Sequence, residues 1–306
     1  IGSTFIRLLL ETIPDASVIN IDALTYAGDM SNLEGIDEVR HRFIHGDICD
    51  RELIGRVVPK GCEAIFNFAA ESHVDRSLLS ADRFIHTNVL GTQVLLDAAR
   101  KKGVRRFIQI STDEVMGSLS DDGDDLFTEN SPLRPNSPYA ASKAAAEMLV
   151  RAAVVSHGLD AVITRCGNNY GPRQFPEKLI PLMIKKALAN EPLPVYGDGS
   201  NVRDWIHAKD HCRAVIRAFY QGQSGEIYNI GARCQKKNLD VVRFILKKTG
   251  RPEELISFVN DRPGHDRRYA IDPAKAETEL GWKPEIEWET GLSETISWYM
   301  NRAGDM

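Results

Sequence analysis

Short apolar runs alternate with stretches of helical periodicity along the first half of the chain. The runs have the length of buried strands and lie at residues 18–21, 42–45, 64–68, 106–110 and 161–165. The periodic stretches predict amphipathic helices at residues 3–12, 51–58, 81–102 and 138–157. Continuously apolar strands that alternate with helices predict an α/β fold, a doubly wound parallel sheet with both faces covered.

The pattern changes after residue 168. The segments "NNYGPRQFPEKLIPL" (168–182) and "EPLPVYGDGSNVRDW" (191–205) are rich in proline, glycine and aromatic residues, as loops that shape a pocket tend to be. Further helices are predicted at residues 206–220, 239–248 and 291–301, with a strand at residues 226–230. We therefore predict a Rossmann-type domain over residues 1–168 and a smaller C-terminal lobe over residues 169–306, with some later segments returning to the first domain.

Composition narrows the class of protein. The 306 residues carry a net charge of −5, which argues against a nucleic-acid-binding protein, because such proteins usually carry a basic field. The chain lacks an apolar run of about 18 residues, so we expect no membrane span. Five scattered cysteines without a Cys-x-x-Cys pair predict reduced thiols in a cytoplasmic protein. The acidic run "SDDGDD" (120–125) is predicted to be a solvated loop.

The N-terminal segment has features of a dinucleotide site. Gly2 opens a helix, and Asp22 ends the following strand about twenty residues later, where an acid accepts hydrogen bonds from the adenosine ribose diol. The same acid would repel the extra phosphate of NADP, so NAD is the predicted cofactor. The first strand and the glycine-rich turn of such a domain would lie before Ile1.

Three later features agree with an NAD site. Asp47 follows the strand at residues 42–45, a position from which a side chain usually contacts the edge of the adenine ring. Ala69 and Ala70 follow the next strand, where small residues let the backbone approach a pyrophosphate. Thr87 and Asn88 lie on a helix that we expect to face the sheet. Each feature alone fits ordinary packing, but their order and spacing predict NAD binding.

The segment "NSPYAASKAAAEML" (136–149) carries the candidate base. Ser137 is a suitable helix cap, and Pro138 suits the first helical turn. Tyr139 and Lys143 are then four residues apart on one helical face, so phenol and ammonium lie close together. We expect the ammonium to lower the phenol's pKa, which would let Tyr139 take a proton from an alcohol near neutral pH. The alternative is a surface tyrosine and a solvated lysine.

Two adjacent acids, Asp113 and Glu114, directly follow the apolar strand at residues 106–110 and the step Ser111–Thr112. Elimination of water across neighbouring carbons needs one acid and one base, and two close carboxyl groups tend to keep one proton. Because adjacent residues of an extended segment point apart, a turn after Thr112 must bring both to one substrate.

These motifs resemble a known family. A Tyr-x-x-x-Lys pair, a Ser-Thr strand end and an N-terminal NAD fold are similar to the extended short-chain dehydrogenase/reductases, and most closely to the dTDP-glucose 4,6-dehydratases. The supporting segments are "DALTYAG" (22–28), "AAESHVDRS" (69–77), "STDEV" (111–115), "SPYAASKA" (137–144), "NNYGPRQFPEKLIPL" (168–182), "VYGDGSNVRDWIHAKDH" (195–211) and "DRPGHDRRYAID" (261–272). They cover nearly the whole chain in order.

The resemblance implies a catalytic role for each matching residue. Tyr139, assisted by Lys143, would deprotonate the glucose 4-hydroxyl while hydride leaves C4 for NAD, and Thr112 would bond the same oxygen. Glu114 would then take the proton from C5, while Asp113 protonates the departing 6-hydroxyl. Return of hydride to C6 would give the 4-keto-6-deoxy sugar, so the enzyme would be a hydro-lyase (a lyase that removes water).

The resemblance also implies binding residues for cofactor and nucleotide sugar. The implied NAD site comprises Ile1, Gly2, Asp22, Ala23, Leu24, Thr25, Asp47, Ile48, Phe68, Ala69, Ala70, Ser72, Thr87, Tyr139, Lys143 and Asn169. The implied nucleotide-sugar site comprises Ser72, Thr112, Asn168, Lys178, Leu179, Pro194, Tyr196, Arg203, Asn238, Arg262 and His265. The family further implies a homodimer in deoxysugar supply.

Several alternatives stay open. Arginines of the second lobe, above all Arg267 and Arg268, could form structural ion pairs instead of binding a diphosphate. His207 and His211 are spaced as a helical metal pair, but no third ligand is evident, so packing or capping is expected and no metal is predicted. Met116 stands where the family usually has tyrosine. An NAD-dependent nucleotide-sugar 4-epimerase and a non-catalytic NAD-binding regulator remain rivals, and UDP- or CDP-glucose could replace dTDP-glucose.

Overall fold

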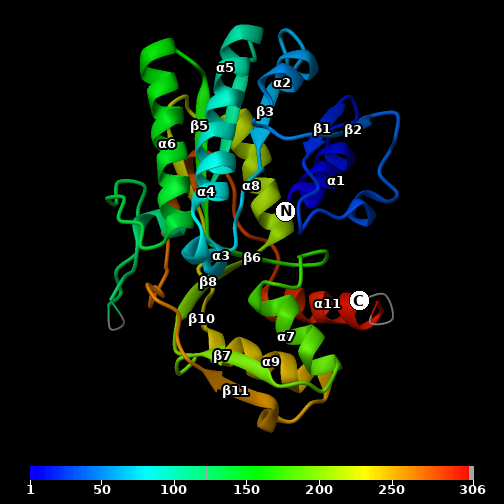
Figure 1. Ribbon diagram of the computed structural model, residues 1–306, viewed down its shortest axis with the longest axis vertical. Coiled ribbons are helices and arrows are strands. Elements are labelled where there is room, and N and C mark those ends of the chain that lie inside the picture. Colours follow the sequence, from blue (N-terminus) through cyan, green and yellow to red (C-terminus); the bar gives the residue numbers. More distant parts are fainter. Residues whose placement is uncertain (121–122, 303–306) are drawn as a thin grey trace.

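The computed structural model describes residues 1–120 and 123–302, which form a larger upper lobe and a smaller lower lobe (Figure 1). A parallel sheet with strand order β3-β4-β5-β9 is the centre of the larger lobe. Its strands are β3 (Ala64–Asn67), β4 (Arg106–Thr112), β5 (Ala161–Cys166) and β9 (Ile227–Ile230). The predicted doubly wound α/β class is confirmed.

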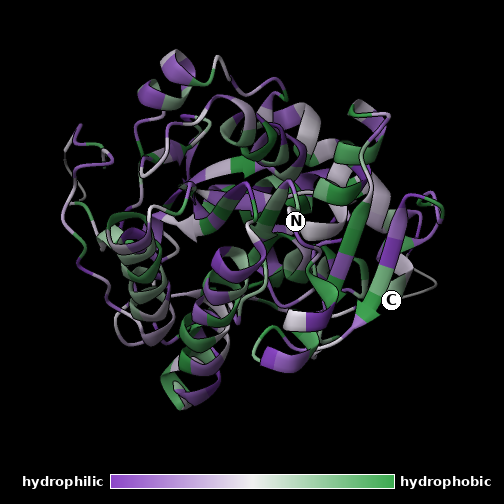
Figure 2. Cartoon of the chain, turned by 90° about the horizontal axis from the view of Figure 1, so that it is seen from above, coloured by the Kyte–Doolittle hydropathy of each residue, from purple (hydrophilic) through white to green (hydrophobic). Residues whose placement is uncertain are grey.

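Helices cover both faces of this sheet, which explains why its strands are apolar on both sides. On one face, Ile108 of β4 packs with Phe5 of α1 (Gly2–Thr12) and Val215 of α8 (Ala208–Gln221). On the other face, Phe107 packs against the remaining helices of this layer. These are α2 (Arg51–Val57), α5 (Thr92–Lys102) and α6 (Pro138–His157). Figure 2 shows purple, hydrophilic residues along many of the outer loops.

A second parallel pair, β1 (Val18–Asp22) with β2 (His41–His45), lies beside the central sheet (Figure 1). Within residues 1–120 and 123–302, β1 and β3 have no ladder of hydrogen bonds between them. Residues of both strands line one cavity, so β1 and β3 present unpaired backbone edges toward a common space.

The smaller lobe has its own apolar core, which includes Ile184, Leu193 and Ile245. Its elements are α7 (Leu179–Leu188), α9 (Asn238–Thr249), α11 (Trp288–Met300) and the parallel strands β7 (Leu193–Tyr196) and β11 (Ile256–Val259). A three-stranded sheet of β6 (Asn168–Tyr170), β8 (Val202–His207) and β10 (Gln235–Lys237) lies between this core and the larger lobe (Figure 1).

Short elements complete the described chain. They are the helices α3 (Val74–Leu79), α4 (Asp82–Phe84) and α10 (Ala274–Glu279), the wide helical turn η2 (Ile85–Gly91), and the tight turns η1 (Met30–Leu33), η3 (Asp113–Met116) and η4 (Glu253–Leu255). The predicted helix at residues 81–102 is thus one helical stretch with a wide turn in it. None of the helices in the described part is long and apolar enough to cross a membrane.

Two expectations for the second half of the chain were wrong. The helix predicted at residues 206–220 begins only at Ala208, because Ile206 and His207 pair with β6 as the end of β8. The segments expected to be pocket loops contain the strands β6, β7 and β8. Local composition did not predict these strands, because their hydrogen-bond ladders join residues far apart in sequence. In the predicted acidic loop, residues 121 and 122 lie outside the described residues, while Asp124 and Asp125 are exposed.

Candidate active site

A cavity of about 1140 Å³ runs from the β1 edge to the junction of the two lobes. Many of the predicted site residues line it: Ile1, Gly2, Asp22, Leu24, Ile48, Phe68, Ala69, Ala70, Ser72, Thr112, Asp113, Glu114, Tyr139, Lys143, Asn168, Asn169, Lys178 and Leu179. Residues from eight separate stretches therefore meet around one space, although they span almost 180 positions of the chain.

The other predicted site residues lie outside the cavity lining. These are Ala23, Thr25, Asp47, Thr87, Pro194, Tyr196, Arg203, Asn238, Arg262 and His265. Tyr196 and Arg262 both donate hydrogen bonds to Asp75, at 3.0 and 3.2 Å. His265 pairs with Asp261, which lies four residues earlier.

The first turn of α1 offers an anion site at one end of the cavity. Ile1, Gly2 and Ser3 line the cavity, and Ile1 provides no side-chain hydrogen bond to the N–H groups of the first turn. Free N–H groups and the helix dipole favour a negative charge there. Asp22 lies at the carboxyl end of β1 in the same lining, and one of its oxygens accepts the Leu24 N–H at 2.8 Å. A diphosphate and a ribose diol fit this combination of donors and acceptor.

A tight turn carries the two adjacent acids. The Thr112 side chain accepts the N–H of Glu114 at 3.3 Å and so caps η3, while its hydroxyl donates to Asp113 at 3.2 Å. Gly117 ends the turn with φ +84, and a Cβ there would lie 2.4 Å from the Arg134 carbonyl oxygen. The turn required by the sequence argument is therefore present, and both carboxyl groups line the cavity.

Burial separates the two acids from ordinary surface carboxylates. Burial, then the charges of Glu114 and Asp204, raises the pKa of Asp113 well above its ordinary value. Burial also raises the pKa of Glu114, although Lys178, Arg262 and Arg203 oppose this shift. One oxygen of Asp113 is buried without a hydrogen-bond partner. Asp113 is therefore the better proton donor, and Glu114, with three cations nearby, the better base.

Tyr139 and Lys143 line the cavity from one face of α6, which Ser137 caps through the Ala140 N–H at 3.1 Å. The expected lowering of the Tyr139 pKa is wrong. Burial, followed by the charge of Glu114, raises that pKa well above its ordinary value. The Lys143 ammonium donates to the Ile110 carbonyl at 2.5 Å, and burial lowers its own pKa to about 8. A second positive charge beside the phenol would be needed to counter the acids.

Met116 does not line the cavity. It is buried in a small apolar cluster with Val115 and Tyr269, and its sulfur accepts a weak hydrogen bond from Arg165 at 3.6 Å. Arg165 also forms a buried ion pair with Glu147 at 2.7 Å. Met116 therefore packs behind the acid turn and not against the cavity.

His207 and His211 do not form the helical metal pair that their spacing allowed. His207 is the cap residue of α8, and its Nδ1 accepts the Lys209 N–H at 3.2 Å. His211 is fully buried and bonds the Asn169 side chain at 2.9 Å. Burial lowers the pKa of His211 to about 3, so the ring is neutral and orients Asn169 in the cavity wall. The expectation of capping and packing is confirmed for this pair.

The cations of the second lobe reach the acid turn from below. Lys178 is almost fully buried and donates to the Ser72 carbonyl at 2.6 Å. Arg203 donates to the Asp266 carbonyl at 2.8 Å, and its guanidinium lies 4.3 Å from the Tyr269 ring centroid. Arg262 has a buried Nε without a hydrogen-bond partner. Some N–H donors of these cations have no hydrogen-bond partner in the described part of the protein, so they are suited to bind a diphosphate.

Arg267 and Arg268 have other partners. Arg267 forms an exposed ion pair with Asp198 at 3.2 Å, and Arg268 donates to the Gln235 side chain at 3.0 Å. The structural alternative is confirmed for Arg267, while Arg268 links Gln235 of β10 to the Asp125 backbone carbonyl, to which it donates at 3.0 Å.

Three residues at this junction were missed. Asp75 bonds both Tyr196 and Arg262, Glu177 accepts the Tyr26 hydroxyl at 3.0 Å, and the thiol of Cys166 contacts Asn169 at 3.4 Å. Each lies inside or beside a segment that the resemblance quoted, so the segment was a signal that these residues matter. The contacts of Asp75 and Glu177 join segments more than a hundred residues apart, which no local pattern encodes, whereas the contact of Cys166 is with a residue only three positions later.

Comparison with known proteins places the chain in a family. The family model described as GDP-mannose 4,6 dehydratase matches residues 1–295. The chain belongs to this family. The resemblance to nucleotide-sugar 4,6-dehydratases predicted from the motifs is thereby confirmed.

Individual relatives agree over nearly the whole length. The low-salt glycan biosynthesis protein Agl12 of Haloferax volcanii is 52% identical, over 98% of this chain and 95% of that protein. A dTDP-glucose 4,6-dehydratase of Streptomyces niveus is 49% identical, over 99% of this chain and 91% of its own. The crystal structure of the dTDP-glucose 4,6-dehydratase DesIV from Streptomyces venezuelae, with NAD bound, superposes with a TM-score of 0.96 at 47% identity. The superposition covers 99% of this chain and 94% of that one.

Proposed function

We propose that this protein is a dTDP-glucose 4,6-dehydratase, a hydro-lyase that uses NAD and forms dTDP-4-keto-6-deoxyglucose. The observation that carries the proposal is the capped turn that holds Asp113 and Glu114 in the same cavity lining as Tyr139 and Lys143. A simple dehydrogenase or epimerase needs the tyrosine and lysine but no acid-base pair. Relatives of that name, nearly half identical over almost the full length, support the same reaction.

The residues around the cavity fit NAD. The open N–H groups of the α1 first turn suit the diphosphate of NAD, and Asp22 suits its ribose. The small side chains of Ala69 and Ala70 let the protein backbone approach the diphosphate closely. Asn169, oriented by His211, lines the same cavity as Tyr139. When bound there, NAD supplies the chemistry of removing hydride from the sugar and returning it. NAD also carries a positive charge in its oxidised form, which opposes the acids that raise the pKa of Tyr139.

The side chains supply the proton transfers. Tyr139 accepts the proton of the sugar 4-hydroxyl, and Thr112 bonds the same oxygen. Oxidation at C4 gives a ketone that acidifies the C5 proton, which Glu114 then removes. Asp113 gives its proton to the 6-hydroxyl, the C6–O bond breaks, and water leaves. The raised pKa of Asp113 keeps its proton available for this step, and the nearby cations favour the ionised form of Glu114.

Turnover measurements test this function. Purified protein is incubated with NAD and, in parallel, dTDP-, UDP- and CDP-glucose, and the 4-keto-6-deoxy product is detected by its absorbance in alkali. We expect product from dTDP-glucose above all. A galactose product would instead establish the 4-epimerase, and binding of both ligands without turnover would establish the regulator. Tyr139→Phe should abolish turnover and retain binding of NAD and dTDP-glucose.

We further propose the domain organisation, the cellular location and the oligomeric state of this protein. Unpaired edges of β1 and β3 on one cavity support a strand between them, preceding Ile1 and followed by the glycine-rich turn. This gives a Rossmann domain that ends near residue 168 and a nucleotide-sugar lobe beyond it. Five free cysteines support a reducing cytoplasmic setting. A homodimer follows from the family alone, and light scattering of the purified protein tests it.

A further inference from the structure

Three potential metal ligands of different chemistry lie together near the β1–β2 end of the molecule. Asp47 and Cys49 follow β2, and His86 lies in the wide turn η2. Their ligand atoms, one each from a carboxylate, a thiol and an imidazole, all lie within 4.8 Å of one another. Asp47 and His86 are exposed and Cys49 is half-buried, so a cation from solvent can reach all three. We call these residues the Asp-Cys-His cluster.

The local fold brings the cluster together in a defined way. One oxygen of Asp47 accepts the backbone N–H of Cys49 at 2.8 Å, which fixes the loop after β2. The thiol of Cys49 lies 3.2 Å from the backbone carbonyl oxygen of His86. Gly91 makes this approach possible, because a Cβ there would lie 2.4 Å from Ile48 Cδ1 and 3.3 Å from the Cys49 sulfur. The loop therefore packs directly on the helix that carries His86.

We propose that the Asp-Cys-His cluster binds a thiophilic divalent cation of the Zn²⁺ type. Sulfur, imidazole nitrogen and carboxylate oxygen are the three ligand classes of zinc sites, and three protein ligands leave a position for water. Bond lengths of about 2.0 to 2.3 Å require the three atoms to close in slightly, which the exposed side chains of Asp47 and His86 can do by rotation. Coordination replaces the S–H bond of Cys49 by a sulfur–metal bond, and the proton passes to solvent.

The position of the cluster predicts what the metal does. Ile48, between two of the ligands, lines the large cavity. Asp47 lies just outside that lining and is the residue that the family resemblance assigns to the edge of adenine. If the Asp47 carboxylate binds a cation, it can no longer accept a hydrogen bond from the cofactor. The cation also adds positive charge next to the adenine site. Zn²⁺ and NAD should therefore bind antagonistically. This consequence rests on the proposed cofactor role, whereas metal binding itself does not.

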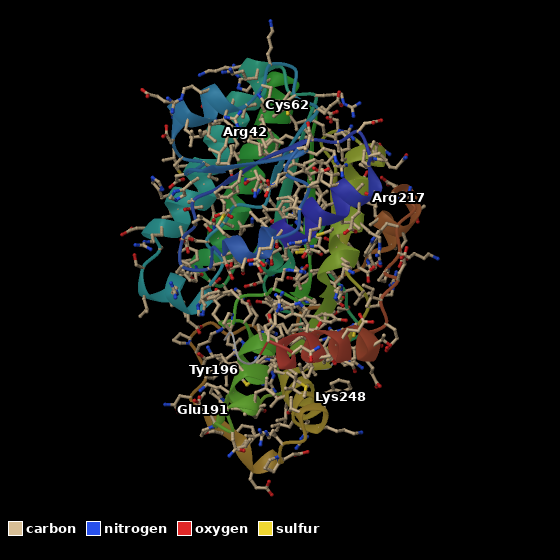
Figure 3. The ribbon with its side chains drawn as sticks, turned by 90° about the vertical axis from the view of Figure 1, so that its right-hand side faces the viewer. Arg42, Cys62, Glu191, Tyr196, Arg217 and Lys248 are labelled. Carbon is tan, nitrogen blue, oxygen red and sulfur yellow. The ribbon has the colours of Figure 1, made fainter. Side chains whose placement is uncertain are left out.

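The test measures metal binding directly, with thiols kept reduced and without substrate. Zn²⁺ affinity is determined by equilibrium dialysis, and Co²⁺ is used as a probe whose absorption reveals a bound thiolate. We expect one equivalent of metal per chain, a thiolate–Co²⁺ band, and affinity at least about tenfold weaker in Cys49→Ser and in His86→Ala. Cys62→Ser is the matched control, since this second half-buried thiol lies elsewhere on the larger lobe (Figure 3).

Each outcome decides one part of the inference. Equal affinity in the wild type and both variants, or no thiolate band, overturns the site. If the site is present, NAD should raise the apparent dissociation constant for Zn²⁺, and Zn²⁺ should slow turnover of the wild type but not of Cys49→Ser. Unchanged Zn²⁺ affinity at saturating NAD overturns the antagonism. Failure of turnover with dTDP-glucose would contradict the proposed function and leave the metal measurements unaffected.

Discussion

At the scale of single residues, burial decides how the acids behave. Asp113 and Glu114 are neighbours in sequence and look equivalent there. In the structure three cations, Lys178, Arg262 and Arg203, oppose the rise in the pKa of Glu114. Only Arg203 does so for Asp113, where the charges of Glu114 and Asp204 raise the pKa further. The division of labour between acid and base therefore follows from charges that come from the second lobe.

Glu114→Gln should separate oxidation from elimination. Because Tyr139 and Lys143 are untouched, hydride removal from the sugar should persist, while loss of water should fall by about a hundredfold or more without the base. Stopped-flow absorbance should then show reduced nicotinamide that accumulates and persists. Glu38→Gln, an exposed acid, is the control. Normal dehydration by Glu114→Gln would contradict the assigned base.

Asp204 should make stability depend on pH. Burial raises its pKa from 3.8 to about 6, so the folded protein binds a proton that the unfolded chain releases between those values. Stability from this group is therefore fully present below about pH 4 and is lost as pH rises through about 6. Relative to Asp204→Asn, the wild type should lose about 3 kcal/mol of unfolding free energy across this window.

Urea unfolding at several pH values on both sides of about pH 6 measures this difference. Asp15→Asn, at an exposed position, should follow the wild type through the whole window. A constant gap between the wild type and Asp204→Asn at all pH values would contradict the raised pKa.

At the scale of elements, the early strands and helices were predictable because their signals are local. The helix at residues 138–157 was predicted with both of its bounds, and Ser137 and Pro138 marked its start, while the structure ends it at Gly158 in a left-handed conformation. The strands β6, β7 and β8 were missed because they are short and depend on distant partners. The end of β8 was taken for helix for the same reason.

The acid turn should depend on Gly117. Alanine there would be strained at φ +84 and would collide with the Arg134 carbonyl, so the turn that carries Asp113 and Glu114 must shift. We expect turnover to fall by about a hundredfold, as for a misplacement of about 1 Å. Steady-state kinetics and thermal unfolding are measured together.

Gly158→Ala is the matched control for this turn. Gly158 has φ +64 but nothing within 4 Å of the added Cβ, so the variant should lose only about 1–2 kcal/mol of stability and keep its turnover. Equal turnover in Gly117→Ala and Gly158→Ala would show that the turn tolerates the shift.

At the scale of the whole molecule, the site is made by two lobes that contact each other directly. The segment from Ser72 to Asp75 in the larger lobe accepts hydrogen bonds from Lys178, Tyr196 and Arg262 of the smaller one. Tyr196 lies in the lower lobe in Figure 3. A nucleotide that binds these side chains must replace or share these contacts.

Arg262→Met should weaken nucleotide binding. Arg262 is partly buried and has an unused buried donor, so its loss should cost a charged hydrogen bond of about 1.5–3 kcal/mol, or about ten- to a hundredfold in the dissociation constant for thymidine diphosphate. Calorimetry measures this constant. Arg243→Met, which removes an exposed ion pair with Glu253 in the same lobe, should leave it unchanged. Equal affinities of the wild type and Arg262→Met for thymidine diphosphate would show that Arg262 does not bind the diphosphate.

The sequence alone determined the α/β class, the NAD-type N-terminal segment, the Tyr139–Lys143 spacing on one helix and the acid step Asp113–Glu114. These follow from periodicity, caps and adjacency, which are properties of neighbouring residues. Only the tertiary structure decided the raised pKa of Tyr139, the burial of Met116 against Arg165, and the meeting of Asp75 with Tyr196 and Arg262. Desolvation and charge act through space, so they exist only once distant segments have packed together.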